Sequence, residues 1–193
     1  MIMFVGPAGA GKSVQGQLLA VCHQLTWLSA GKLLRETNDP QVYEVMARGE
    51  LVSPALVNRV IFHHLDDQPE LDNIIIDGYP RSLEQAQALS EYSQQRMGRE
   101  CIDFVVVFDV TADEIFQRLS LRGRLDDTRE VIEYRLESYK ADTLPLVNYY
   151  AERGAKVVHI NGIGSRGEVL DRIESAYNDY RATRPVEAAD ANH

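Results

Sequence analysis

Residues 1–5 read Met-Ile-Met-Phe-Val, and the next eight read Gly6-Pro7-Ala8-Gly9-Ala10-Gly11-Lys12-Ser13, which fits the pattern G-x-x-x-x-G-K-[ST] without a mismatch. The apolar run stops at a glycine-rich turn, as a buried parallel strand does, and residues 14–24 follow a helical pattern. Small residues let consecutive backbone N–H groups surround phosphate oxygens, and the helix adds the positive end of its dipole. The segment therefore predicts a strand, a phosphate-binding loop and a helix. Lys12 is expected to reach the outer phosphates and Ser13 to face magnesium, directly or through water.

Similar apolar runs recur along the chain at 73–77, 102–110 and 156–160, with a weaker one at 26–29. The helical patterns between them begin at recognisable signals. Thr111 and Ser165 each stand three residues before a glutamate, as in a capping box, and Ser53 precedes a proline at the first helical position. Strands that alternate with helices predict a five-stranded parallel sheet covered on both faces, a three-layer α/β sandwich. On the first helix, Cys22 follows the apolar pattern and is expected in the core.

The composition favours one globular domain. The 193 residues are 45% hydrophobic and 25% charged, the usual proportions of a soluble domain. Lysine and arginine total 20 against 29 acidic residues, and the net charge of -9 disfavours wholesale binding to nucleic acid or to anionic membranes. Two cysteines are too few for a disulfide framework, no segment approaches the ~20 apolar residues of a membrane span, and the start lacks the basic flank of a signal peptide. We therefore expect a cytoplasmic protein without a nucleic-acid or membrane partner, monomeric by default.

A second group of functional residues follows the predicted strand 73–77, in the sequence Asp77-Gly78-Tyr79-Pro80-Arg81. Ligands of open α/β sheets bind beyond the carboxyl ends of the strands, so Asp77 and Arg81 are expected to face the nucleotide crevice. Asp77 is suited to hold magnesium-bound water, and the planar fork of Arg81 is suited to grip a second phosphate. A strand-ending turn with an ordinary surface ion pair is the structural alternative.

Arginines form a third group. Arg118 and Arg122 lie four residues apart on one predicted helical face, Arg124 follows, and Arg135 lies on the next helix. Such spacing also fits a solvated basic face. In an acidic chain, however, the concentration of arginines between 118 and 135 favours a site that needs positive charge over the oxygens of a phosphoryl group in transfer. It therefore favours a transferase over a nucleotide-dependent switch or motor.

Five motifs resemble those of the adenylate kinase family, in order and at plausible spacings, from Met1 to about Tyr177. They are the phosphate loop, Leu28-Ser29-Ala30-Gly31 with Leu33-Leu34-Arg35, Asp77-Gly78-Tyr79-Pro80-Arg81 with Gln85, Arg124-Leu125-Asp126-Asp127, and Arg135-Leu136-Glu137-Ser138-Tyr139. The resemblance implies a P-loop kinase fold with the sheet order 2-3-1-4-5, and the reaction ATP + AMP ⇌ 2 ADP with Mg²⁺. It further implies one kinase domain over 1–183, with a monophosphate-binding flap at 29–58 and a minimal lid at 123–129. The polar tail 184–193 is expected to be disordered.

The resemblance also implies roles for individual residues. ATP is expected to contact Gly9, Ala10, Gly11, Lys12, Ser13, Val14 and Arg118, the last at the adenine. AMP is expected to contact Ala30, Arg35, Leu51, Val52, Gly78, Arg81, Gln85, Arg124 and Arg135. The catalytic set, which stabilises the phosphoryl group in transfer, comprises Lys12, Arg81, Arg122, Arg124 and Arg135. Gln85 suits AMP chemically, since its amide can pair with the donor–acceptor edge of adenine.

The chain departs from the family pattern around both nucleotides. Ser13-Val14 stands where adenylate kinases commonly have Gly-Thr, Ala30 replaces a frequent threonine, and Lys32 takes a position that is usually acidic. The sequence Leu-Ser-Ala-Gly around Ala30 is similar to that of UMP/CMP kinases. A kinase for UMP, CMP or another nucleoside monophosphate is therefore an alternative function.

The largest departure is at the lid, where only Gly123 separates Arg122 from Arg124. No cysteine cluster lies there, which excludes a zinc-bearing lid. The nearly absent lid also motivates an alternative of another class, a nucleotide-binding regulator that has lost the transfer reaction.

Overall fold

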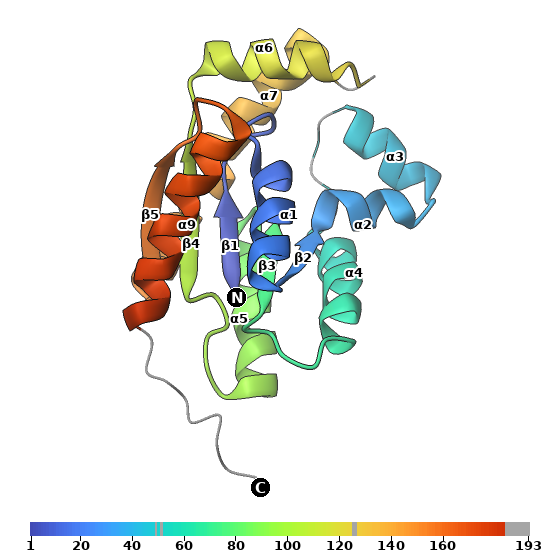
Figure 1. The fold of residues 1–193 in the computed structure, drawn as a ribbon. Coiled ribbons are helices and arrows are strands. Elements are labelled where there is room, and N and C mark those ends of the chain that lie inside the picture. The colour runs from blue at the N-terminus through green and yellow to red at the C-terminus, as the bar shows by residue number, and fades with distance from the viewer. Residues whose placement is uncertain (49, 51, 125–126, 184–193) are drawn as a thin grey trace, which may run out of the picture.

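The computed structural model describes residues 1–48, 50, 52–124 and 127–183, and its sheet has the predicted strand order (Figure 1). Five parallel strands run in the order β2-β3-β1-β4-β5. Their bounds are β1 Ile2–Val5, β2 Thr26–Ser29, β3 Ile74–Asp77, β4 Phe104–Asp109 and β5 Lys156–Asn161. The pairing Phe4↔Asp77 between β1 and β3 sets the start of the phosphate loop beside the carboxyl end of β3.

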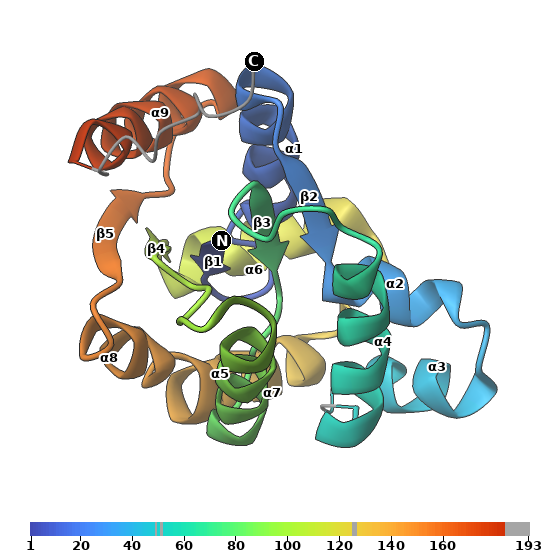
Figure 2. The same cartoon turned by 90° about the horizontal axis from the view of Figure 1, so that it is seen from below.

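Helices cover both faces of the sheet, which confirms the three-layer sandwich. The described helices are α1 Lys12–His23, α2 Ala30–Glu36, α3 Pro40–Ala47, α4 Pro54–Asp66, α5 Leu83–Met97, α6 Ala112–Arg122, α7 Arg129–Ser138, α8 Leu146–Ala151 and α9 Arg166–Thr183. A π-helical turn, Tyr139–Thr143, follows α7 directly. Figure 2 shows α1 and α9 on one side of the sheet and α5 and α8 on the other. No helix of the described residues is long and apolar enough to cross a membrane.

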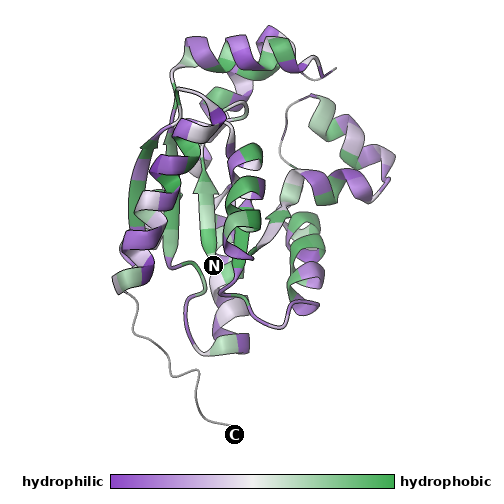
Figure 3. Cartoon of the chain, in the orientation of Figure 1, coloured by the Kyte–Doolittle hydropathy of each residue, from purple (hydrophilic) through white to green (hydrophobic). Residues whose placement is uncertain are grey.

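Two apolar cores separate the three layers. Alternate residues of β1 belong to different cores. Ile2 and Phe4 belong to the core formed with α1, α6 and α9, whereas Met3 and Val5 belong to the core formed with α2, α4, α5 and α8. All four side chains are buried, as expected for a central parallel strand with both faces covered. Figure 3 shows this pattern as apolar strands among helices with mixed polar and apolar faces.

The predicted helix starts are confirmed in position and differ in how they are capped. Ser165 and Glu168 form a reciprocal capping box, because Ser165 N–H donates to Glu168 Oε2 at 2.7 Å and Glu168 N–H donates to Ser165 Oγ at 3.3 Å. At Thr111 only the side-chain half forms, from Glu114 N–H to Thr111 Oγ1 at 3.4 Å. Ser53 occupies the cap position before α4, but its side chain makes no capping hydrogen bond.

The expectation that Cys22 lies in the core is wrong, since its side chain is exposed. The buried face of α1 is formed by Gln15, Gly16, Leu19 and Ala20. At about 100° per residue, Cys22 lies about 20° from Gln15, at one edge of this face, and it is the second-last residue of α1. The apolar pattern around Cys22 continues past the face that the sheet and α9 cover.

The described parts of the predicted flap and the predicted lid lie at the carboxyl end of the sheet. The predicted flap, 29–58, contains α2, α3 and the start of α4, and Figure 1 shows α3 away from the sheet beside α2. The predicted lid, 123–129, begins where α6 ends and finishes where α7 begins. Two of its residues, 125 and 126, lie outside the described residues, as do Leu51 and the tail 184–193.

Candidate active site

A cavity of about 1210 Å³ opens at the carboxyl ends of the strands, where ligands of open α/β sheets bind. The phosphate loop forms its floor, and the predicted flap, the turn after β3, α6, α7 and the loop after β5 form its walls. Every residue predicted to contact a nucleotide lines this cavity, apart from Leu51, which lies outside the described residues. The structure thus brings together the three groups of residues that the sequence distinguishes.

The phosphate loop requires glycine at two of its positions. Gly9 and Gly11 have φ values of 84° and 97°, in the left-handed region that side chains disfavour. A Cβ on Gly9 would also lie 2.9 Å from Leu119 Cγ of α6. The helix α1 begins directly after Gly11, so its N-terminal N–H groups face the cavity that the loop lines.

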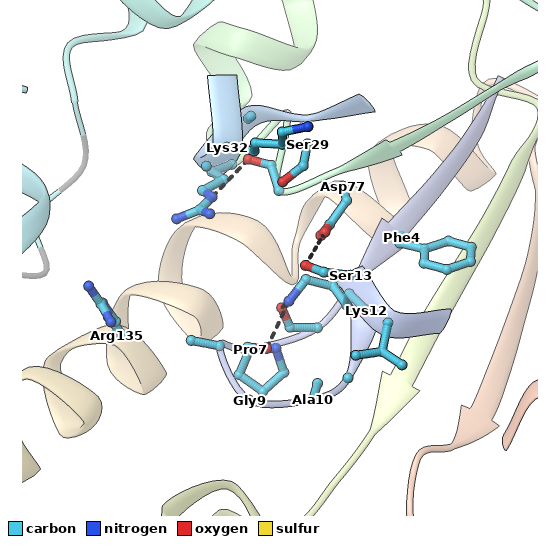
Figure 4. A pocket seen from close by; sticks show the side chains of 18 of the residues that line it. Phe4, Pro7, Gly9, Ala10, Lys12, Ser13, Ser29, Lys32, Asp77 and Arg135 are labelled. Carbon is cyan, nitrogen blue, oxygen red and sulfur yellow. Dashed lines mark hydrogen bonds between the residues drawn. The ribbon is translucent and has the colours of Figure 1, made fainter. Parts of the chain in front are cut away.

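Lys12 lies folded back over this loop (Figure 4). Its Nζ donates to the carbonyl oxygens of Gly6 at 2.6 Å and Pro7 at 2.8 Å. Burial lowers the pKa of Lys12 to about 8, because the negative charge of Asp77 only partly offsets burial and the repulsion from Arg81 and Arg122. An ammonium group carries three donors, so these two bonds leave Lys12 the capacity to bind a phosphate oxygen as well.

Ser13 and Asp77 bring two oxygen-bearing side chains together beside Lys12. Ser13 Oγ donates to Asp77 Oδ2 at 2.6 Å, as Figure 4 shows, and Asp77 is buried. Mg²⁺ is held in such sites by one or two oxygen ligands of the protein together with phosphate oxygens and water. The residues present therefore fit the predicted magnesium site.

Arg81 is anchored through its main chain and its side chain. Its N–H donates to Oε1 of the buried Gln85 at 2.7 Å, and its Nε donates to the carbonyl of Gly78 at 2.8 Å. The cavity walls lower the pKa of the Arg81 guanidinium by desolvation, and Arg135 and Arg35 lower it further against the opposing effect of Asp77. The guanidinium groups of Arg35 and Arg135, from separate parts of the sequence, thus both act electrostatically on that of Arg81.

Asp127 gathers two of the predicted catalytic arginines. Both of its carboxylate oxygens accept from Arg122, with Nε at 2.8 Å from Oδ2, and Arg135 Nη1 lies 3.7 Å from Oδ1. The Arg124 N–H also donates to Oδ2 at 3.3 Å. The Asp127 side chain is only 2% exposed. This carboxylate was not among the predicted site residues, although it is the last residue of the motif Arg124-Leu125-Asp126-Asp127 that carries part of the family resemblance.

The wall on the other side of the phosphate loop is built around Arg118. Its Nε pairs with Glu114 at 2.7 Å, and its Nη atoms donate to the carbonyls of Ala10 at 3.3 Å and Gly162 at 2.8 Å. The buried Gln15 donates from Nε2 to the carbonyl of Arg166 at 3.0 Å. The loop 162–166 was not predicted as part of the site, although its start, a glycine-rich turn directly after a parallel strand, was a usable signal.

A phosphate loop and a cluster of arginines in one cavity, on a parallel sheet of order 2-3-1-4-5, define a P-loop kinase of the nucleoside-monophosphate class. A family model described as adenylate kinase matches residues 4–155. The chain belongs to the adenylate kinase family and is a phosphotransferase.

Individual relatives agree with this assignment. The adenylate kinase of Synechococcus sp. (strain RCC307) is 38% identical over 181 residues, which cover 91% of this chain and 97% of that protein. The adenylate kinase of Mycobacterium ulcerans (strain Agy99) is 39% identical over 181 residues, with the same coverage of both chains. Adenylate kinase 1 of Nostoc sp. (strain PCC 7120 / SAG 25.82 / UTEX 2576) is 38% identical over 181 residues, which cover 90% of this chain and 96% of that protein. These names give no support to the UMP/CMP kinase or to the non-catalytic regulator.

Proposed function

We propose that this protein catalyses the reversible, Mg²⁺-dependent transfer of the terminal phosphoryl group of ATP to AMP, which yields two ADP. The observation that carries the proposal is that two separate groups of residues suited to bind phosphate line one cavity. One is the phosphate loop with Lys12, and the other is the set of arginines around Arg81. Two nucleotides with their phosphates directed toward each other would satisfy both groups at once.

On the donor side, the phosphate loop would hold the phosphates of ATP through the N–H groups of residues 9–14. Arg118 would lie against the adenine, where its contacts with Ala10 and Gly162 already fix its guanidinium plane. Ser13 and Asp77 would hold Mg²⁺ directly or through water. A bound ion would supply positive charge against the negative charge that develops on the phosphates during transfer.

On the acceptor side, Arg35 and Arg81 would hold the AMP phosphate, and Gln85 would meet the base. Gln85 Oε1 already accepts from the Arg81 N–H, so a contact of this amide with the base would also steady the arginine. Ala30, Val52 and Gly78, which line the cavity, would complete the acceptor site together with Leu51.

The chemistry requires no nucleophilic side chain, because an oxygen of the AMP phosphate attacks the γ-phosphorus of ATP. The bond between that phosphorus and the β–γ bridging oxygen breaks, and ADP leaves. Catalysis then depends on position and on positive charge over the transferred group. Lys12, Arg122, Arg124 and Arg135 would supply that charge, and Asp127 keeps Arg122 and Arg135 side by side. We propose that the flap 29–58 and the lid 123–129 close over the nucleotides and exclude water.

We also propose a cytoplasmic location, supported by Cys22 and Cys101, both of which are free thiols.

The test is an assay of ADP formation from ATP with AMP, UMP, CMP or dTMP as acceptor. We expect strong turnover with AMP, and turnover of UMP in preference to AMP would overturn the choice of acceptor. Lys12→Ala should lower kcat by orders of magnitude, whereas Lys156→Ala, at the exposed amino end of β5, should not. A protein that forms no ADP with any acceptor would be the regulator instead.

A further inference from the structure

The main chain of Arg81 is held from both sides. Gln85 Oε1 accepts from its N–H at 2.7 Å, and Thr143 Oγ1 donates to its carbonyl at 3.0 Å. Gln85 is a near neighbour on the following helix, whereas Thr143 lies 62 residues further along the chain. The two bonds fix the peptide units on either side of the Arg81 Cα. They therefore set the direction in which the arginine side chain leaves the backbone.

The widened turn after α7 places Thr143 at this position. Leu144 N–H donates to the carbonyl of Tyr139 at 2.8 Å, five residues earlier, instead of the usual four. Pro145 follows, and a proline cannot continue an α-helix because it lacks an N–H and its ring meets the carbonyl four residues before it. One extra residue in a turn rotates the rest of the helix by about 100°. Such π-turns are rare and are frequent at functional sites.

Thr143 also belongs to the same stretch of helix as a predicted catalytic residue. Arg135 lies on α7, which runs directly into the π-turn Tyr139–Thr143. Both Arg135 and Thr143 line the cavity, and the charge of Arg135 acts on the Arg81 guanidinium. One continuous helical stretch thus carries one arginine of the proposed acceptor site and the hydroxyl that anchors another.

We propose that Thr143 is a positioning residue for Arg81. The bond from Thr143 keeps the Arg81 guanidinium oriented relative to that of Arg135, so that both guanidinium groups bind the phosphate of the acceptor nucleotide. The inference rests on the proposed function, because it takes AMP as that nucleotide. Thr143 itself touches the backbone of Arg81 and acts through it.

The first experiment compares Thr143→Val, which keeps the side-chain shape without the hydroxyl, with Thr143→Ser, which keeps the hydroxyl. Loss of one hydrogen bond should raise the KM for AMP about three- to tenfold in Thr143→Val. The KM for ATP should stay unchanged, and Thr143→Ser should restore the KM for AMP. Thr183→Val is the matched control, since Thr183 Oγ1 also donates to a backbone carbonyl, that of Tyr180, but far from the cavity. It should leave both constants unchanged.

The second experiment asks whether Thr143 acts through Arg81. In an Arg81→Lys background, Thr143→Val should add little to the loss of AMP affinity, measured by calorimetry with AMP alone. The proposal is overturned if Thr143→Val leaves the KM for AMP unchanged, if it affects ATP and AMP equally, or if its full effect persists in that background. Failure of the proposed function has a different signature, because the unmodified protein would then form no ADP from ATP and AMP.

Discussion

Gly16 on α1 faces the indole ring of Trp27 on β2, at the contact between this helix and the sheet. A Cβ added at position 16 would lie 2.7 Å from Trp27 Cδ1 and 2.8 Å from Nε1, well inside the normal contact distance. Gly16→Ala therefore requires the indole ring or the helix to move. Since α1 begins at Lys12, a shift of the helix would also disturb the phosphate loop.

The expected change in stability follows from two opposing effects. Overpacking of a core costs about 1–3 kcal/mol, whereas alanine in place of glycine within a helix stabilises by up to about 1 kcal/mol. The net loss should be about 1–2 kcal/mol, which lowers Tm by about 2–8 °C for a chain of this size. Gly167 on α9 is the matched control, because a Cβ there meets no atom within 4 Å. Gly167→Ala should be neutral or slightly stabilising.

Urea denaturation followed by circular dichroism and by tryptophan fluorescence measures this effect. Trp27 is the only tryptophan of the chain, so its emission reports on the contact itself. Trp27→Phe, which has a smaller ring, should recover part of the stability lost in Gly16→Ala. The reasoning is refuted if Gly16→Ala is as stable as the unmodified protein with unchanged Trp27 emission, or if the smaller ring recovers nothing.

Four further predictions concern the cavity. The pKa of Lys12 is lowered to about 8, so Lys12 loses its positive charge in the free enzyme as pH rises through that value. The pH profile of kcat/KM for ATP should therefore fall above about pH 8. A flat profile would contradict this prediction. Between about 8 and 10.5 the unfolded chain binds more protons at Lys12 than the folded one, so the contribution of this group to stability should become more favourable as pH rises. Ser13→Ala removes the hydroxyl bonded to Asp77 and should raise the Mg²⁺ concentration needed for half-maximal rate, measured by Mg²⁺ titration at fixed nucleotide; an unchanged titration would argue against a metal at this pair. Asp127→Asn weakens the pairing with Arg122. It should lower the free energy of unfolding, measured by urea denaturation, by about 1–2 kcal/mol, and it should also lower kcat. Wild-type values of the unfolding free energy and of kcat would contradict the role assigned to this carboxylate.

Much of the fold was readable from the sequence because its signals are local. Each strand is a short apolar run, and the phosphate loop is continuous from Gly6 to Ser13. The phosphate loop, α2 and the turn 78–81 line the cavity for a related reason, since each follows the carboxyl end of a strand at one edge of the sheet, whereas Arg118 and Arg135 reach it from within α6 and α7.

The features that the sequence did not disclose depend on contacts between distant segments. Asp127 is one of several acidic residues near arginines, and only the tertiary structure shows that it is buried against Arg122 and Arg135. Thr143 reaches Arg81 through a backbone carbonyl, which leaves no complementary side chain in the sequence to search for. Cys22 failed as a core prediction because an apolar pattern does not say how wide the covered face of a helix is.

The two thiols differ in solvent exposure, so the number of thiols that react with a reagent reports on unfolding. Cys22 is open to solvent, while Cys101 is buried next to β4, and burial raises the pKa of its thiol to about 12. A thiol-specific reagent should therefore attach once to the folded protein and twice when the molecule opens. Mass spectrometry after a short exposure to the reagent would count the opened molecules directly, without an engineered label, and nucleotides that stabilise the closed protein should slow the second attachment.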